Sequence, residues 1–386
     1  MQIYLDYSAT TPTRPEAIAT MQTVMTATWG NPSSLHHWGN RAATHLEQAR
    51  SQVADLLHAG LDQVVFTAGG TEADNLAILG ITQRYDTPQH VITSSVEHAA
   101  IAQTLHRLEQ QGWQVTYLPV DTHGCVDPAT LTAAIQANTV LISIIFGQSE
   151  IGTLQPIAAL GHIARAHSIP FHTDAVQVAG RLPIDVRSLP VDLLSLSSHK
   201  IYGPQGAGAL YIHPDVALQP LMGGGGQELG LRPGTQAVPI LAGFGVAAAL
   251  ATQEMPTETV RLIHLRDRLF AQLADVPDLI PTGHPRSRLP HHVSFYLDSA
   301  DGDRLSGKTL VRQMNLAGIG ISAGSACHSG KLTPSPVLKA LGLSDRAAKS
   351  GIRLTLGRRT TLADVDWTAM VLKQILARVR PELVTR

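Results

Sequence analysis

From about residue 60 to residue 215, short runs of β-branched and other apolar residues alternate with longer stretches in which apolar residues recur at helical spacing. Parallel strands joined by crossover helices produce this pattern. It predicts strands at Val64–Thr67, His90–Thr93, Gln114–Leu118, Val140–Ile145, Pro170–His172, Leu193–Leu196 and Ala209–Ile212. The helices predicted between them are Thr71–Arg84, Ala99–Gln111, Pro128–Ala137 and Pro156–His167. Because no helix separates the last two strands, we expect an antiparallel pair there, within a mixed and mainly parallel sheet.

A second, smaller unit follows a long helical region, Thr235–Ala274, and a loop with four prolines, Pro277–Pro290. Its pattern predicts strands at His292–Leu297, Gly318–Ser322 and Ile352–Leu356, and helices at Gly307–Asn315, Ser335–Leu341 and Thr361–Ala377. We therefore expect an N-terminal segment (1–14), a large domain (31–276) and a small α+β domain (15–30 and 277–386). The helix Pro15–Ala27 is expected to pack with the small domain.

The composition is that of a folded chain with a small ligand. Only 15% of the 386 residues are charged and 44% are hydrophobic, so the chain can bury a core. The net charge of −1 gives no reason to expect nucleic acid or an anionic membrane as a partner. The apolar stretch Val238–Ala251 is shorter than the ~20 residues of a membrane span, so we interpret it as a buried helix. With so little net charge, the chain is better suited to a small neutral or zwitterionic ligand than to nucleic acid or an anionic membrane.

The cysteine content points to a reducing compartment. Cys125 and Cys327 are the two cysteines, too few for a disulfide framework in a chain of this length. The first residues lack a basic region followed by an apolar stretch, so we expect no secretory signal and a cytoplasmic location. Histidine pairs such as His36–His37 and His291–His292 lack metal-ligand spacing, and no resident metal is expected.

Two residues at predicted strand ends suggest a particular chemistry. Lys200 stands where a strand meets a Gly-Pro turn, and a lysine desolvated in such a pocket can act as a Schiff-base nucleophile. Asp174 ends another strand 26 residues earlier, at the sheet edge where ligands of α/β proteins bind. A buried carboxylate there can keep the ring nitrogen of pyridoxal phosphate protonated. Each residue also has an ordinary interpretation, a surface lysine and a helix cap.

Two further motifs follow predicted strands. In Val64-Val-Phe-Thr-Ala-Gly-Gly-Thr71 a strand passes through two glycines into a helix, whose first backbone N–H groups can bind a phosphate. Thr71 and Glu72 alternatively serve only as a helix cap. His98 follows the strand at Val91, and its imidazole could stack on an aromatic cofactor and transfer protons.

Five ordered motifs together resemble those of cysteine desulfurases of the NifS/IscS-type group: Gly69-Gly-Thr71-Glu, Glu97-His98, Asp174-Ala-Val-Gln177, Ser197-Ser-His199-Lys200 and Gly324-Ser-Ala-Cys327. The resemblance extends from Tyr4 to Arg358. It implies the α/β fold of aspartate aminotransferase (fold type I), with a large mixed, mainly parallel sheet domain and a small α+β domain. It also implies pyridoxal 5′-phosphate as cofactor, L-cysteine as substrate and a homodimer.

The resemblance assigns roles residue by residue. Lys200 would form the Schiff base with the cofactor, Asp174 would hold its ring nitrogen, and His98 would lie over its ring. Gln177 would lie near the ring hydroxyl. The phosphate would be held by Gly70, Thr71, Ser197 and His199, and by Thr235 of the other protomer. Arg353 would pair with the carboxylate of the substrate.

Cys327 would be the sulfur acceptor in this family. It lies in a run of small residues that we expect to be mobile and exposed, and there it would carry a persulfide and pass sulfur to an acceptor or scaffold protein, for iron–sulfur cluster assembly or another pathway. It is also a candidate transient iron–sulfur ligand. Three positions depart from the family pattern. Ser149 replaces an asparagine that contacts substrate, Leu229 replaces an arginine, and Pro233 replaces a serine.

Other functions remain open from the sequence alone. A pyridoxal-phosphate cystine C–S lyase or selenocysteine lyase would not need Cys327. The segment Gly302–Thr309 fits the Walker A pattern, although its context differs from that of a P-loop nucleotide-binding protein. A catalytically inactive dimer acting as a scaffold is the third alternative. Cys125 reads as an ordinary residue between a turn and a helix.

Overall fold

The computed structural model of the protein describes residues 2–298, 306–324 and 333–379. Its large unit is built on a seven-stranded sheet with the order β2 (Val64–Thr67), β8 (Gly208–Ile212), β7 (Leu193–Ser197), β6 (Phe171–Asp174), β5 (Thr139–Ser143), β3 (His90–Ser94) and β4 (Gln114–Leu118). Strands β7, β6, β5, β3 and β4 are parallel, and β8 is antiparallel to both of its neighbours. The predicted mixed sheet and its antiparallel pair are confirmed.

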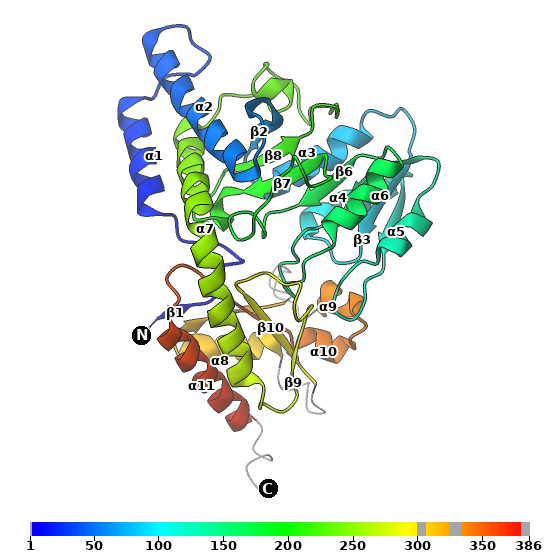
Figure 1. Cartoon of the computed structure of the whole chain (residues 1–386), viewed down its shortest axis with the longest axis vertical. Helices are drawn as coiled ribbons and strands as arrows, with labels where there is room; N and C mark the ends of the chain where they lie inside the picture. Colours follow the sequence, from blue (N-terminus) through cyan, green and yellow to red (C-terminus); the bar gives the residue numbers. More distant parts are fainter. Residues whose placement is uncertain (1, 299–305, 325–332, 380–386) are drawn as a thin grey trace.

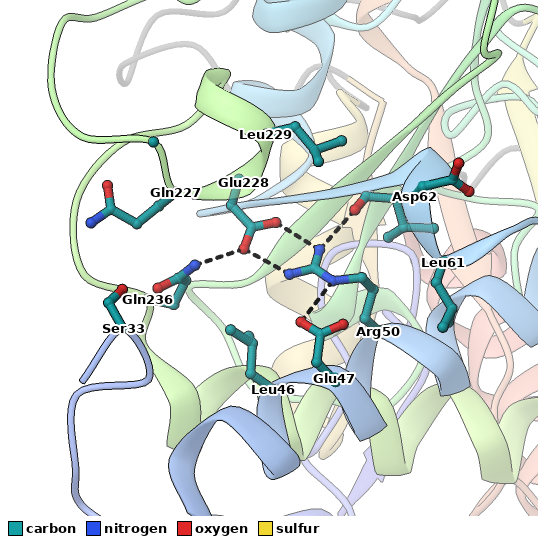
Figure 2. Close-up of a pocket in the computed structure, with 12 residues that line it drawn as sticks. Ser33, Leu46, Glu47, Arg50, Leu61, Asp62, Gln227, Glu228, Leu229 and Gln236 are labelled. Atoms are coloured by element: carbon teal, nitrogen blue, oxygen red, sulfur yellow. Dashed lines mark hydrogen bonds and ion pairs between the residues drawn. The ribbon is translucent and has the colours of Figure 1, made fainter. Parts of the chain in front are cut away.

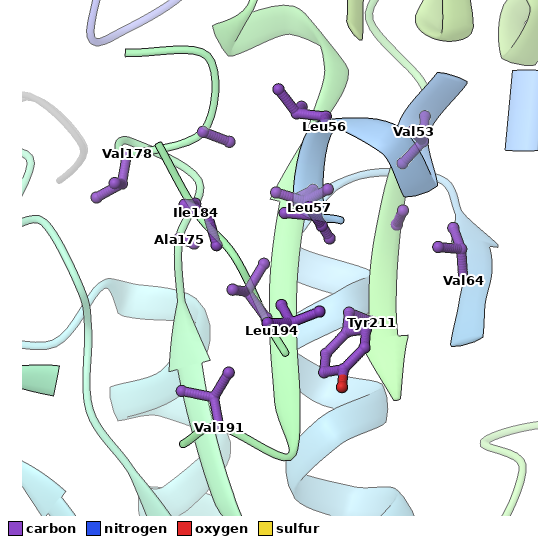
Figure 3. Packing of buried hydrophobic residues seen from close by; sticks show 14 of the residues in the cluster. Val53, Leu56, Leu57, Val64, Ala175, Val178, Ile184, Val191, Leu194 and Tyr211 are labelled. Atoms are coloured by element: carbon purple, nitrogen blue, oxygen red, sulfur yellow. The ribbon is translucent and has the colours of Figure 1, made fainter. Parts of the chain in front are cut away.

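Helices cover both faces of this sheet. One face packs against α2 (His37–Leu57), α5 (Pro128–Ala134), α6 (Ile157–Ala166) and the first half of α7 (Val238–Leu273). The other face packs against α3 (Gly70–Thr82) and α4 (Ala99–Gln110). Alternate residues of each strand enter the two cores, as a side-chain period of two requires: Val64 and Phe66 join one core and Val65 the other. Figure 3 shows part of the first core, to which Leu57 of α2 and Leu194 of β7 both belong.

The small unit contains a four-stranded antiparallel sheet with the order β12 (Ser322–Ala323), β13 (Ile352–Thr355), β10 (His292–Leu297) and β9 (Leu279–Pro281). Its core includes α8 (Gly307–Leu316), α11 (Leu362–Val379) and the second half of α7. Two short helices, α9 (Pro336–Ala340) and α10 (Asp345–Lys349), complete it. A separate pair joins β1 (Ile3–Tyr4) to β11 (Ile319–Gly320). The predicted strand Gly318–Ser322 is therefore two short pieces that belong to different sheets.

Helix α7 connects the two units, as Figure 1 shows. Residues Leu241–Ala251 belong to the core of the large unit, and residues Leu262–Leu273 belong to that of the small unit. By length and composition alone, α7 could cross a membrane, but half of its apolar window is buried inside the protein. Buried core helices have the same properties, so this is weak support for a membrane span.

The helix α1 (Pro15–Ala27) packs differently from our expectation. It lies against the first half of α7, with Val24 in a small cluster with Val238 and Ala242 (Figure 1). The segment before it joins the small unit instead, through β1 and the buried Leu5. The apolar face of a helix predicts that it packs, but the complementary surface is set by tertiary structure.

Candidate active site

The carboxyl ends of four strands bring the predicted site residues to one edge of the large sheet. Strands β2, β3, β6 and β7 all run in the same direction, because β8 is antiparallel to both β2 and β7. His98 follows β3 and Asp174 ends β6. Lys200 ends η2 (Ser198–Lys200), the 3₁₀ turn that follows β7. This edge is where ligands bind in open α/β sheets.

A cavity of about 550 Å³ opens at this edge. All four predicted phosphate contacts within one chain, Gly70, Thr71, Ser197 and His199, line it. Its wall includes the first turn of α3, whose free N–H groups favour an anion. The turn before α3 approaches β8 closely, because a Cβ on Gly208 would lie 2.5 Å from the backbone carbon of Gly69. Because glycine has no Cβ, Gly208 allows the turn to lie this close to the strand.

The amino group of Lys200 is held by the N-terminal segment. Its Nζ donates hydrogen bonds to the carbonyl oxygens of Ser8, at 2.5 Å, and Ala9, at 2.7 Å. Burial lowers the pKa of Lys200 from 10.5 to about 8, and the cations of Arg353 and Arg181 contribute to this. A larger share of the amine is therefore neutral near pH 7 than in an ordinary lysine.

Asp174 is buried at the end of β6. Its Oδ1 accepts a hydrogen bond from the backbone N–H of Val176 at 2.9 Å. Burial raises the pKa of Asp174, and the nearby His98 and Lys200 oppose this effect. A carboxylate so placed pairs well with a cationic N–H group.

A second buried carboxyl group, that of Asp74 on α3, lies within 4.8 Å of Asp174. Burial raises the pKa of Asp74 well above its ordinary value, and the charge of Asp174 adds to the shift. Oδ1 of Asp74 lies 3.8 Å from Nε2 of His172. The same nitrogen lies 3.0 Å from the hydroxyl oxygen of Ser195. Burial lowers the pKa of His172 to about 3, so this ring is neutral. We infer that Asp74 is the neutral member of the carboxyl pair.

His98 is the exposed N-cap of α4. Its Nδ1 accepts from the backbone N–H of Ala100 at 3.2 Å, which leaves Nε2 to exchange protons. One polar atom from each of Asp74, His98 and Asp174 lies within 4.8 Å of the other two. Within the described ranges this is the only group of three such side chains close enough for a metal. Because two of them are predicted cofactor residues, we assign no metal here.

Gln177 and His199 also contact the N-terminal segment. Nε2 of Gln177 donates to the carbonyl oxygen of Ser8 at 3.0 Å, and its buried Oε1 has no partner in the described part of the chain. Nδ1 of His199 lies 3.1 Å from the hydroxyl of Thr10. Burial lowers the pKa of His199 to about 4, so this side chain is neutral.

Arg353 on β13 reaches the same region from the small unit. Its Nη1 donates to the carbonyl oxygen of Ser149 at 3.1 Å, and Nη2 forms an ion pair with Oδ1 of Asp6 at 2.6 Å. Nε2 of the buried His292 also lies 3.0 Å from the Ser149 oxygen. The two predicted substrate-binding residues, Arg353 and Ser149, are thus in direct contact.

Sequence reasoning missed Asp6, Asp74, Ser8 and Arg181 as parts of this region. The guanidinium of Arg181 donates to the carbonyl oxygens of Gln177 and Lys200. Asp6 and Ser8 lie in the segment Tyr4-Leu-Asp-Tyr-Ser-Ala-Thr-Thr-Pro12, where the family resemblance begins, so its polar residues were a usable signal for those two. For Asp74 and Arg181 the sequence carried no signal that we can identify.

Several predicted residues lie elsewhere. Cys327 is outside the described residues, as are Gly302 to Leu305. Thr235 is exposed before α7 and does not line the cavity. Lys308 and Thr309 lie in the first turn of α8, in the small unit, and neither lines the cavity. Cys125 is partly buried, and burial together with Asp121 raises its pKa to about 11, which makes it a poor nucleophile.

A larger cavity of about 730 Å³ lies apart from this site (Figure 2). Three of its charged side chains pair with one another: Arg50 forms two hydrogen bonds with Glu228, at 2.7 and 2.9 Å, and contacts Glu47. Leu229 of η3 (Glu228–Gly230) also lines it, with a positive φ of 60° and a largely exposed side chain. Because the guanidinium of Arg50 is already paired with Glu228 and Glu47, we assign no chemistry to this cavity.

Comparisons with known proteins agree with this geometry. Residues 3–367 match the family described as Aminotransferase class-V. A protein named Cysteine desulfurase IscS from Methanosarcina thermophila is 45% identical over 379 residues, which are 98% of this chain and 93% of the relative. A protein of the same name from Dictyoglomus turgidum is 42% identical over 381 residues, 98% and 95% of the two chains.

Solved structures are also similar. One titled NIFS-LIKE PROTEIN has a TM-score of 0.91 and 32% identity, over 98% of this chain and all of the other. Another, titled SspA in complex with cysteine, has a TM-score of 0.81 and 36% identity, over 92% and 99% of the two chains. The chain therefore belongs to the class V aminotransferase family and, within it, to the NifS/IscS-type group of cysteine desulfurases.

Proposed function

We infer that this protein is a cysteine desulfurase, which takes sulfur from L-cysteine and releases L-alanine. The observation that carries this function is the amine of Lys200, with its lowered pKa, at the sheet edge where Asp174 is buried. The similarity to curated cysteine desulfurases supports the same activity, and the relative solved with cysteine supports the substrate.

The residues of the site fit pyridoxal phosphate as cofactor. The cavity beside the first turn of α3 suits a phosphate, and the unpartnered Oε1 of Gln177 suits a hydroxyl group. Asp174 suits a protonated ring nitrogen. When bound to Lys200, this cofactor withdraws electrons from the Cα of an amino acid.

The residues of the chain supply the rest of the chemistry. Lys200, once free, removes the Cα proton, and Nε2 of His98 accepts the proton of the substrate thiol. Arg353 binds the substrate carboxylate. The thiolate of Cys327 attacks the substrate sulfur, so that an S–S bond forms as the C–S bond breaks. The electron pair stays with the carbon product, which takes up one proton at Cβ and one at Cα, the number that Lys200 and His98 removed, and leaves as L-alanine.

We also propose a homodimer with shared sites. Thr235 would reach the phosphate of the partner protomer, as the family resemblance implies. Large apolar side chains are exposed near the loop between α1 and α2, with Trp29 at 68% and Leu35 at 95% exposure, and Trp38 and Leu229 at more than half. A group of large apolar side chains that are exposed together favours an interface. A sulfur acceptor or scaffold protein would be a further partner.

The function is tested by following the products from L-cysteine. We expect L-alanine and sulfide in equal amounts in the presence of a reductant, and a persulfide on Cys327 without one. Lys200→Ala should lose the covalent cofactor and about a thousandfold in rate. Cys327→Ser should lose the persulfide, whereas the control Cys125→Ser should keep it.

Two other results would contradict the proposal. Pyruvate and ammonia as products would identify a lyase. ATP hydrolysis by colourless protein would identify a nucleotide-binding function.

A further inference from the structure

The guanidinium of Arg353 already holds a carboxylate that belongs to the chain itself. Nη2 contacts Oδ1 of Asp6 at 2.6 Å, and Nη1 donates to the carbonyl oxygen of Ser149 at 3.1 Å. The two charged side chains are largely buried, with exposures of 12% and 19%. The Nε of Arg353 is buried and has no hydrogen-bond partner among the described residues. One side of the guanidinium is therefore occupied, and one buried donor remains.

The backbone fixes Asp6 in this place. The segment after β1 pairs with β13, through a bridge between Asp6 and Thr355. The N–H of Thr355 donates to the carbonyl oxygen of Leu5 at 2.7 Å, and the N–H of Ser8 donates to the Thr355 hydroxyl at 2.9 Å. Arg353 and Thr355 are two residues apart on the strand and so share a face. The ion pair is thus a consequence of strand pairing, unlike a contact between two mobile surface chains.

We propose that Asp6 limits the affinity for the substrate, because it occupies the carboxylate site of Arg353 in the free enzyme and competes with the substrate there. This inference rests on the proposed function, in which Arg353 binds the carboxylate of L-cysteine. A guanidinium offers two edges for bidentate binding. A substrate carboxylate that binds the Nη1–Nη2 edge displaces Asp6. A substrate carboxylate that binds the Nη2–Nε edge lies beside the carboxylate of Asp6.

Both arrangements have the same consequence for affinity. Displacement breaks a largely buried ion pair, and sharing brings two anions together. Asp6 therefore weakens the binding of every α-carboxylate ligand. It has no such effect on a ligand that lacks this group. The contact with Ser149 still orients Arg353 when the charge of Asp6 is absent.

The test compares L-alanine with ethylamine, which is the same molecule without its carboxylate. Calorimetric titration of the holoenzyme gives both dissociation constants. Asp6→Asn should lower the dissociation constant of L-alanine by about fivefold and leave the dissociation constant of ethylamine unchanged. The KM for L-cysteine should fall in proportion. Asp215→Asn is the matched control, because it removes the same charge from a side chain that is 90% exposed.

Two more variants separate the possible failures. Asp6→Ser should change L-alanine binding in the same direction as Asp6→Asn, which keeps the test valid if one of them folds poorly. Arg353→Lys keeps the charge but loses the planar fork, and should weaken L-alanine binding by about tenfold. If Arg353→Lys has this effect and both Asp6 variants leave the affinity unchanged or lower it, the role of Asp6 is overturned and the proposed function stands. If Arg353→Lys has no effect, the carboxylate binds elsewhere, and both proposals about this arginine fail.

Discussion

The amine of Lys200 illustrates how far a single side chain depends on its surroundings. Its sequence context predicted a pocket lysine, but not the groups that act on its charge. The structure places the cations Arg353 and Arg181 where they favour the neutral amine, and Asp174 and Asp6 where they favour the ammonium form. Because the first effect and burial prevail, the pKa falls to about 8.

This pKa can be measured through the uptake of pyridoxal phosphate by apoenzyme. Only the neutral amine attacks the aldehyde, so the rate should rise with pH and reach half of its maximum at about pH 8. An ordinary lysine would give a midpoint above 10. Stopped-flow absorbance at several pH values gives the profile.

Arg353→Gln serves as the control for this profile. Removing a cation near Lys200 raises the pKa of the amine, so the midpoint should move to higher pH. A wild-type midpoint above about pH 9.5, the region of unperturbed lysines, would contradict the lowered pKa.

Contacts between distant parts of the chain explain which site residues the sequence could reveal. Lys200, Asp174 and His98 each follow a predicted strand, so the strand pattern alone pointed to their common edge. Asp6 meets Arg353 across 347 residues of sequence, and Asp74 meets His172 only because α3 packs on β6. No local pattern marks such pairs.

Strands and helices were predicted best where their periodicity was strong. The seven strands of the large sheet lie close to their predicted positions, and their carboxyl ends account for the site. Helix α2 was not predicted, although its buried Leu46, Val53 and Leu57 recur at helical spacing and give a usable signal. Strand β9 lies in the proline-containing loop, where pairing with β10 overrides local preference.

The close approach of β8 to the turn before α3 gives a prediction about Gly208. Gly208→Ala would place a Cβ 2.5 Å from backbone of Gly69, so the turn must shift. We expect a loss of stability of about 1–3 kcal/mol, together with weaker binding of pyridoxal phosphate. Urea unfolding and equilibrium dialysis measure the two effects. Gly223→Ala is the control, since nothing lies within 4 Å of its added Cβ, and equal behaviour of the two variants would contradict the steric argument.

The division of the molecule into two units was predicted more fully than their connections. The small unit begins before the loop at residues 277–290, where its start was predicted, because Leu262–Leu273 of α7 already belong to its core. Helix α1 packs on α7, and the segment before it joins the small unit. Sequence patterns identify apolar faces, but many faces in a protein of this size are compatible with one another.

The apolar surface near α2 gives a prediction about assembly. In solution the protein should have twice the mass of its 41.2 kDa chain, as measured by light scattering. Trp38→Glu places a charge on this surface and should raise the dimer dissociation constant by at least about tenfold. Trp367→Glu changes a tryptophan of similar exposure on α11 and should leave the mass unchanged. A monomeric wild-type protein would refute the dimer.

Helix α7 makes one mechanical demand on any movement between the two units. Because one half of α7 is packed in each core, neither unit can rotate against the other unless α7 bends. Pro256 stands inside the helix, between the two anchored stretches, and has no N–H to donate to the carbonyl of Thr252. We therefore expect α7 to bend at Pro256, where this hydrogen bond is missing. Such a bend would move Arg353 of the small unit relative to Lys200 of the large unit.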